Sequence, residues 1–438
     1  MTEPLDYEAN WSSERPPPPK GALLAIFLIV LSDLMGFGLI IPSLPFYARQ
    51  FHASDLQVGL IFSIYSLCQL VAAPILGLTS DRVGRRPVLI FSQCGSVIGY
   101  LVLALATSRQ WLNPLTGLLL VYASRTIDGI SGGNISTAQA YVSDVTPPEG
   151  RARGMGMLGA AFGIGFSIGP AMGGILAHFH PSLPALGAAI FSFFAAVQSI
   201  VRLKEPARHS HEGEEEAMLF LHPARFKPIL QNRTLVQLLG ISFLSMTAFV
   251  MMESVFAIFL NDRFGFRELA VGGFFAMAGV VIIIVQGGLM GRLTKAFGEW
   301  ALVIVGPMLV MTAMSILFVV AWNWRIGLQL GVAMIICAGM CNATGRSVQT
   351  PALSSLVSKS ADPRQQGAVF GLFHMLGSLA RVLGPLIATG GYSRHTTAPF
   401  WMAGSLMAVV ALWTTGLRTR VMGAGASILP TPVPAPHE

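Results

Sequence analysis

The residues of this chain that could do chemistry are ionisable side chains inside long apolar stretches. Asp33 lies in the first stretch, Arg125 and Asp128 in the fourth, and Glu253 in the seventh. Removing a carboxyl group from water disfavours its charged form, so a buried acid can take up a proton. An ionisable group inside a membrane is a functional candidate by default. These four residues are therefore predicted to couple proton binding to function.

Each of these residues also has a structural interpretation. Asp33 could be a hydrogen-bonding side chain that helps a Gly-rich helix to pack. Arg125 and Asp128 lie three residues apart, on one face of a helix, so Asp128 could serve only to neutralise Arg125. Glu253 could pair with an arginine of the same half of the chain. The sequence leaves both interpretations open.

A wider set of side chains in the apolar stretches is predicted to line a substrate cavity. It comprises Asp33, Gln69, Arg125, Asn134, Met252, Glu253, Arg346, Gln349, His374 and Arg381. His374 could titrate near neutral pH, or it could be a hydrogen-bonded packing residue. Flexible methionines suit varied ligands. No residue spacing calls for a metal or a cofactor.

The elements that must position these side chains are membrane spans. The chain has 438 residues, of which 53% are hydrophobic and 11% are charged, whereas an ordinary soluble domain is about 25% charged. We therefore expect an all-α polytopic membrane protein. Hydropathy selects twelve spans: 22–47, 56–79, 87–107, 115–142, 152–177, 182–201, 235–260, 270–290, 301–321, 327–357, 367–391 and 398–416.

The distribution of Lys and Arg predicts the orientation of these spans. Of the 28 basic residues, 19 fall on one side, six on the other, and Arg125, Arg346 and Arg381 inside spans. The positive-inside rule then makes both termini cytoplasmic. The net charge of +7 reflects this asymmetry, so we expect no nucleic-acid partner.

The chain also contains an internal repeat. The segment beginning at Gly77 has a degenerate copy at Gly291, Gly154 corresponds to Gly367, and Gly169 to Gly384. Two six-span halves with a site near mid-membrane are typical of transporters. The predicted organisation is a disordered cytoplasmic N-terminus (1–21), a first half (22–203), a cytoplasmic linker (204–233), a second half (234–417) and a disordered cytoplasmic tail (418–438).

One segment between two apolar stretches is unusually rich in charge. It reads Gly-Leu-Thr-Ser-Asp-Arg-Val-Gly-Arg-Arg-Pro over residues 77–87. Such a segment cannot lie in hydrocarbon, so it is predicted to be a short loop. Its ion pairs could form a latch that a moving bundle makes and breaks. The predicted latch residues are Gly77, Asp81, Arg82, Gly84, Arg85 and Arg86.

The fifth span carries glycines at helical spacing together with a proline. Small residues let helices approach closely, and proline introduces a kink. Generic close packing would explain the glycines but not the whole string. The predicted packing and kink residues are Gly165, Gly169, Pro170, Gly173 and Gly174.

These segments resemble motifs of the major facilitator superfamily. Residues 77–87 match its pattern G-x-x-x-D-R-x-G-R-R/K, and residues 33–45 resemble D-x-x-G-x-G-x-x-x-P-x-x-P of its drug:proton antiporter branch. Arg125 stands where that branch has a fourth-span arginine, and the glycines from Gly159 to Gly174 resemble its fifth-span motif. The resemblance implies two pseudo-symmetric six-helix halves that alternate in access, with Asp81 facing the start of the eleventh span in the outward-open state.

The chain departs from the tetracycline exporters of that branch at two places. Those proteins carry an acid just before a tyrosine in the third span, where this chain has Gly99 before Tyr100. They also have an acid in the ninth span, which is absent here. These departures argue against tetracycline as the substrate.

The predicted function is therefore transport and not enzymatic catalysis. We expect proton-coupled efflux of small amphipathic or lipophilic compounds, such as drugs, by a monomer in the plasma (inner) membrane. The partners would be the substrate, protons and the lipid bilayer. A proton-coupled or facilitative importer of a small polar metabolite would share the fold, although the fifth-span string argues against it. A polytopic receptor or membrane enzyme is the alternative from a different class.

Overall fold

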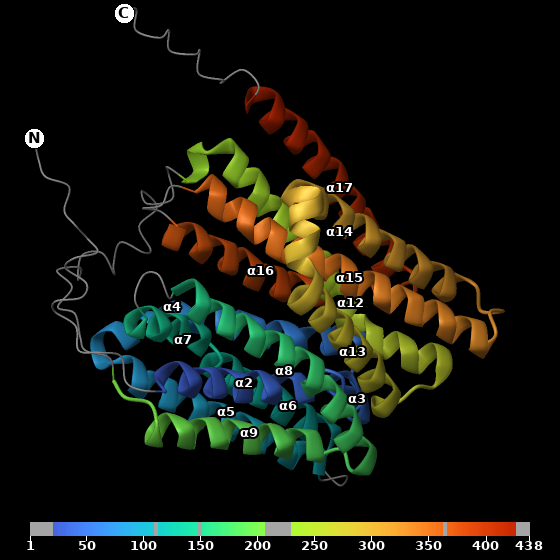
Figure 1. Ribbon diagram of the computed structural model, residues 1–438. Helices are drawn as coiled ribbons and strands as arrows, with labels where there is room; N and C mark the ends of the chain where they lie inside the picture. Colours follow the sequence, from blue (N-terminus) through green and yellow to red (C-terminus); the bar gives the residue numbers. More distant parts are fainter. Residues whose placement is uncertain (1–20, 109–112, 147–150, 206–228, 362–365, 426–438) are drawn as a thin grey trace, which may run out of the picture.

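The computed structural model describes residues 21–108, 113–146, 151–205, 229–361 and 366–425 (Figure 1). Within these ranges every regular element is a helix. Most of the expected N-terminal segment, linker and tail lies outside the described residues. The last helix continues through Arg418 to Gly425, so it ends later than the boundary expected at residue 417. No proline interrupts the sequence in that stretch.

The first half consists of helices that lie in the lower part of Figure 1. They are α2 (Ala22–Ile40), α3 (Leu44–Gln50), α4 (Asp55–Val83), α5 (Arg85–Ser108), α6 (Pro114–Ser131), α7 (Asn134–Val145), α8 (Arg151–Phe179) and α9 (Leu183–Val201). Local sequence marks where they begin. At Ser54, for example, the side chain and Gln57 form a reciprocal capping box at the start of α4.

The second half lies above it in the same view. Its elements are α12 (Arg233–Phe264), α13 (Glu268–Ile283), the π-helix η2 (Ile284–Leu289), α14 (Met290–Trp322), α15 (Leu328–Ser360), α16 (Gln366–Tyr392) and α17 (Ala398–Gly425). Gly265, with φ of 68°, adopts the left-handed conformation that ends α12. Gly298, with φ of 74°, makes the turn inside α14.

All twelve expected spans fall on helices, but length and hydropathy mark only nine candidate spans in the described part of the chain. Residues Glu268–Trp322 count as one span of 55 residues because no break separates α13 from α14. The expected fourth span is divided at Gly132 and Gly133 into α6 and α7. Of α8, only Gly163–Phe179 is counted, as a shorter apolar helix. The count of twelve stays a prediction.

Helix packing repeats between the halves. In the first half α2 packs on α8 and α9, α5 on α6 and α9, and α4 on α6. The second half repeats this pattern: α12 packs on α16 and α17, α14 on α15 and α17, and α13 on α15. The two halves therefore have the same internal arrangement. Between them, α4 packs on α16 and α8 packs on α13.

Large apolar side chains cover the outside of the bundle as well as its interior. Phe91, Ile190 and Leu412 are 64%, 68% and 74% exposed. Large exposed apolar side chains on helices of this length fit a lipid-facing surface.

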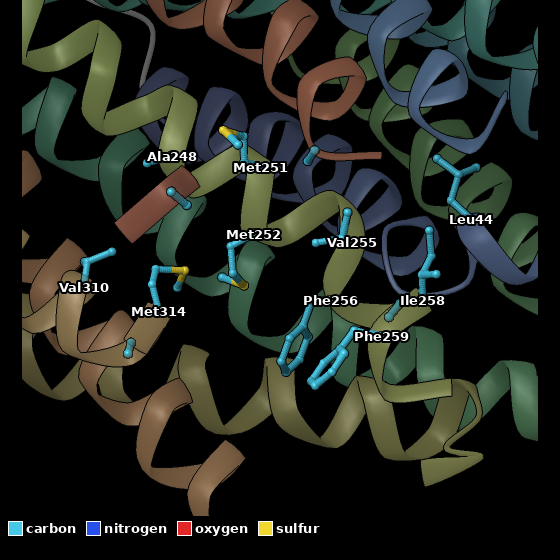
Figure 2. Close-up of a cluster of buried hydrophobic side chains, with 14 of the residues drawn as sticks. Leu44, Ala248, Met251, Met252, Val255, Phe256, Ile258, Phe259, Val310 and Met314 are labelled. Carbon is cyan, nitrogen blue, oxygen red and sulfur yellow. The ribbon is translucent and has the colours of Figure 1, made fainter. Parts of the chain in front are cut away.

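The largest buried cluster lies around α12, as Figure 2 shows. Met251, Met252, Val255 and Phe259 of α12 belong to it, together with Met314 of α14 and other residues. Leu44, from the first half, is part of the same cluster. The buried core is therefore continuous between the halves.

Candidate functional site

A buried ion pair lies on α6. Arg125 Nη1 is 3.1 Å from Asp128 Oδ2, and both side chains are only 2% exposed. The guanidinium group also lies 5.5 Å from the ring centroid of Tyr100 and 5.9 Å from that of Tyr65. Breaking a buried pair by removing one partner is strongly destabilising. The geometry therefore fixes Arg125 and Asp128 relative to each other.

Asp33 of α2 lies close to this pair. Its carboxyl group is near Asp128, Asn134 at the start of α7, and Gln93 of α5. Gln93 is fully buried, and neither atom of its amide has a hydrogen-bond partner among the described residues. The first half thus places one acid, Asp128, and two amides near Asp33. Sequence reasoning missed Gln93, whose signal was a polar amide inside an apolar stretch.

A cavity lies between the two halves, and we call it the central cavity. Its volume is about 50 Å³. Three charged residues line it, namely Arg125 from the first half and Glu253 and Arg381 from the second. Aromatic and aliphatic side chains supply most of the rest, including Phe37 and Tyr65. The cavity therefore brings a possible proton carrier and two arginines into one apolar space.

A second cavity, which we call the C-half cavity, lies within the second half and has a volume of about 100 Å³. It shares Arg381 with the central cavity. Its polar lining residues are Ser242, Ser245, Arg346, Gln349, Thr350, His374 and Arg381. Gln349 Nε2 donates a hydrogen bond of 2.7 Å to Ser245 Oγ, which fixes the amide. The C-half cavity is therefore polar and carries positive charge.

Six of the ten side chains predicted to line a substrate cavity line one of these two. They are Arg125, Glu253, Arg346, Gln349, His374 and Arg381. Asp33, Gln69 and Asn134 line neither. Gln69 instead donates a hydrogen bond of 2.8 Å to the carbonyl oxygen of Gly132.

Met252 also lines neither cavity. It is 7% exposed and belongs to the buried cluster of Figure 2. The reason is its position on α12, which is buried on most of its surface. The assignment of Met252 to a substrate site stays a prediction.

The prediction that residues 77–87 form a short loop is wrong: α4 continues to Val83 and α5 begins at Arg85, so only Gly84 lies between the two helices. The charged side chains can stay in helices because they lie at helix ends and pair with one another. Arg85 forms ion pairs with Asp81 and with Asp144 of α7, the latter at 3.0 Å. Glu205, which follows α9, accepts hydrogen bonds from the backbone N–H groups of Arg85 and Arg86 at 2.6 and 2.9 Å. A carboxylate is favoured at a helix N-terminus. These contacts of Arg85 and Arg86 lie within the first half.

Glu205 also explains why residue 84 is a glycine. Gly84 has φ of 117°, a conformation that side chains rarely adopt. A Cβ atom there would lie 2.8 Å from the Glu205 carboxylate. The predictions did not include Glu205. Asp81 was expected to face the start of the eleventh span in the outward-open state. Residues 362–365, which directly precede that span, lie outside the described residues, so this contact stays a prediction.

The end of the bundle opposite residues 77–87 carries polar contacts between the halves. Arg49 of α3 binds Asp262 of α12, with Nη2 3.0 Å from Oδ2, and also Asp55 at 3.0 Å. Tyr392 of α16 donates a hydrogen bond of 3.0 Å to Asp262. Deeper in the bundle, Ser63 Oγ donates one of 2.7 Å to the carbonyl oxygen of Val382. We call Arg49, Asp55, Asp262 and Tyr392 the end cluster.

Glycines allow close approach between helices at the same end. A Cβ atom on Gly174 of α8 would lie 2.9 Å from the Cα atom of Gly272 of α13. Within the first half, one on Gly169 would lie 2.8 Å from the Cα atom of Gly38. Gly165 and Gly173 contact α2 in the same way, and α8 runs through Pro170 without ending. The fifth-span glycines thus lie at contacts with both α2 and the opposite half.

A sequence model of the Major Facilitator Superfamily matches residues 26–385, most of both halves. The chain is a member of the Major Facilitator Superfamily. This confirms the family inferred from residues 77–87 and the all-α polytopic fold. It also makes the chain a multi-pass membrane transporter of small molecules, and not an enzyme.

Named relatives of this superfamily member are drug-resistance proteins. It is 32% identical over 406 residues to "Tetracycline resistance protein, class C" of Escherichia coli, covering 89% of this chain and 95% of that protein. It is 29% identical over 386 residues to "Multidrug resistance protein 1" of Bacillus subtilis (strain 168), covering 87% and 93%. These relatives bear out the resemblance to the drug-exporter branch.

Among solved structures, the superfamily member resembles that of the human organic anion transporter MFSD10 (TETRAN). The identity is 27%, the TM-score is 0.65, and the match covers 91% of this chain and 100% of that one. The fold of the two halves is therefore that of an established transporter.

Proposed function

We propose that this superfamily member exports small amphipathic compounds in exchange for protons. The observation that carries the proposal is the central cavity, where a carboxyl group (Glu253) and two arginines (Arg125 and Arg381) face one apolar space between the halves. The drug-resistance relatives support efflux as the direction. The substrates named for those relatives indicate the general kind of compound and not a specific one.

The proposed cycle alternates between two states. In this structure, polar contacts join the two halves at the end cluster and deeper in the bundle, between α4 and α16. At the other end, Arg85 and Lys359 pair with acids of their own half. If the positive-inside rule sets the orientation, both termini are cytoplasmic and the structure is the inward-facing state. Residues 77–87 would then latch the cytoplasmic end in the opposite state.

Proton coupling is assigned to Asp33 and Glu253, one acid in each half. A neutral carboxyl group can cross a dry barrier at far lower cost than a carboxylate. A proton taken up outside would therefore let the halves rock inward, and its release inside would precede substrate binding. The Arg125–Asp128 pair lies close enough to Asp33 to influence its protonation.

The remaining assignments follow from this cycle. The transporter acts as a monomer in the plasma (inner) membrane, because residues 22–203 and 234–417 together complete the bundle. A proton-coupled importer of a polar metabolite would have the same fold.

The test is transport by purified protein in liposomes that contain a pH-sensitive dye. Lipophilic drugs, sugars and amino acids are added in turn. Proton movement opposite to that of an amphipathic compound supports the proposal. Movement of protons together with a sugar or amino acid would replace it with the importer.

A further inference from the structure

The charged groups of the two cavities do not balance. Arg125 has a carboxylate partner at 3.1 Å in Asp128. Arg346 and Arg381 have none: no carboxylate of a described residue lies within 4.0 Å of either guanidinium group. Glu253 is the acid that their charges affect. One carboxylate cannot neutralise two guanidinium groups, so the lining keeps a surplus of positive charge.

The hydrogen-bond donors of these two arginines are also poorly satisfied. Arg381 Nη2 donates a bond of 3.1 Å to Ser378 Oγ, but its buried Nε atom has no partner among the described residues. The acceptor found for Arg346 Nη1 is the Met246 sulfur, at 3.7 Å, and thioether sulfur is a weak acceptor. A buried donor without a partner is unfavourable. Both side chains line the C-half cavity, so a ligand there could supply acceptors.

The surroundings indicate what else such a ligand contains. Phe373, Leu353 and Met246 line the same cavity. The Arg346 guanidinium carbon lies 3.4 Å from the ring centroid of Phe249, which fixes its plane. A guanidinium group offers paired donors that match carboxylate, sulfonate or phosphate oxygens. An apolar, preferably aromatic, body would contact the remaining wall.

From this geometry we infer that the cargo is an amphipathic organic anion whose acidic group binds between Arg346 and Arg381. The inference rests on the proposed function for the statement that the ligand is transported. It differs from that proposal because it selects anions among the amphipathic compounds that the drug-resistance relatives would suggest.

The test uses three probes with one ring and different charge: 1-naphthoate, 1-naphthamide and 1-naphthylmethylammonium. Their binding to the purified full-length protein is measured by isothermal titration calorimetry. We expect naphthoate to bind about tenfold more tightly than the amide, since hydrogen bonds to charged groups contribute that much or more. The ammonium compound should bind most weakly. Equal affinities, or preference for the ammonium, would overturn the inference without any variant.

Variants then locate the site. Arg346→Gln and Arg381→Gln should each reduce naphthoate affinity about tenfold and leave amide affinity unchanged. Arg292→Gln, which removes an exposed charge from α14, is the matched control and should have no effect. Naphthoate binding that is unaffected by both cavity variants would contradict the assigned site.

A parallel transport assay separates this inference from the proposed function. Naphthoate that binds through the arginines, while no compound exchanges for protons in liposomes, would sustain the anion site and refute proton-driven export. Proton-coupled export of lipophilic cations, with no preference for naphthoate in binding, would refute the anion site and sustain export.

Discussion

Arg49 of the first half and Asp262 of the second are joined by two hydrogen bonds, one of them 3.0 Å from Nη2 to Oδ2. They are 213 residues apart in sequence, so their contact exists only while α3 and α12 meet. Burial alone would lower the pKa of Arg49, but hydrogen bonds to Asp262 and Asp55 raise it above its ordinary value. The cluster therefore loses its attraction only when the acids are protonated or the halves separate.

Removing Arg49 should favour separation of this end. Each half-exposed pair is worth up to about 1 kcal/mol, or roughly a fivefold change in an equilibrium. Arg49→Ala should therefore increase the population with separated ends about fivefold. Double electron–electron resonance measures that population. The spin labels are attached to His52→Cys and Arg267→Cys in a variant whose native cysteines have been replaced. Arg49→Lys is the control that keeps the charge. An unchanged distance distribution in Arg49→Ala would rule out this role.

Two adjacent glycines of α13 provide a matched test of the contact between α8 and α13. A Cβ atom on Gly272 would lie 2.8 Å from both the Cα atom of Gly174 and the carbonyl oxygen of Pro170, whereas one on Gly273 would meet no atom within 4 Å. Overpacking costs about 1–3 kcal/mol. Gly272→Val should therefore increase the distances between the spin labels at positions 52 and 267, and Gly273→Val should not. Equal effects of the two variants would show that the contact does not control the equilibrium.

The contributions of the Arg125–Asp128 pair to stability and to transport can be measured separately. Arg125→Leu alone leaves Asp128 buried without its partner, which should cost about 3–5 kcal/mol. The double variant, with Asp128→Leu as well, should recover most of that stability. Thermal unfolding in detergent measures both. If the double variant also keeps full proton-driven transport, the pair serves only to neutralise charge.

The charge of the cargo determines how transport responds to voltage. One proton moving inward and one monovalent anion moving outward transfer two charges, each worth about 2.3 kcal/mol per 100 mV. Exchange of a proton for a monovalent cation transfers none. In liposomes whose membrane potential is set with potassium and valinomycin, naphthoate export should accelerate when the side that corresponds to the cytoplasm is negative. Rates that do not depend on voltage would contradict exchange of an anion for a proton.

Local spacing explains what the sequence could predict. Arg125 and Asp128 pair because a spacing of three residues on one helix brings them together. Residues 77–87 carry a family signature, but their charge wrongly predicted a loop where the helices continue up to Gly84 and start again after it. The end cluster joins residues from different halves, so only the packing of the halves reveals it. Arg49 nevertheless had a signal: it is one of six basic residues on a side otherwise poor in them.

Met252 shows what the sequence could not predict. On a helix that is apolar on nearly all sides, the sequence does not indicate which face meets a cavity, and the structure buries this residue in the core. Glu253, the next residue, faces the central cavity. Charge therefore identified four residues that line the cavities, namely Arg125, Glu253, Arg346 and Arg381. It did not do so for Asp33, because the sequence does not show which side of α2 meets a cavity.

The central claim, that protons drive export through Asp33 and Glu253, is tested most directly in liposomes with an imposed pH gradient. The wild-type protein should move substrate against its gradient while protons move the other way. Asp33→Asn or Glu253→Gln should abolish this movement but keep substrate exchange in the absence of a gradient, and Glu253→Asp should keep both. Full proton-driven transport in both neutral variants would contradict the account.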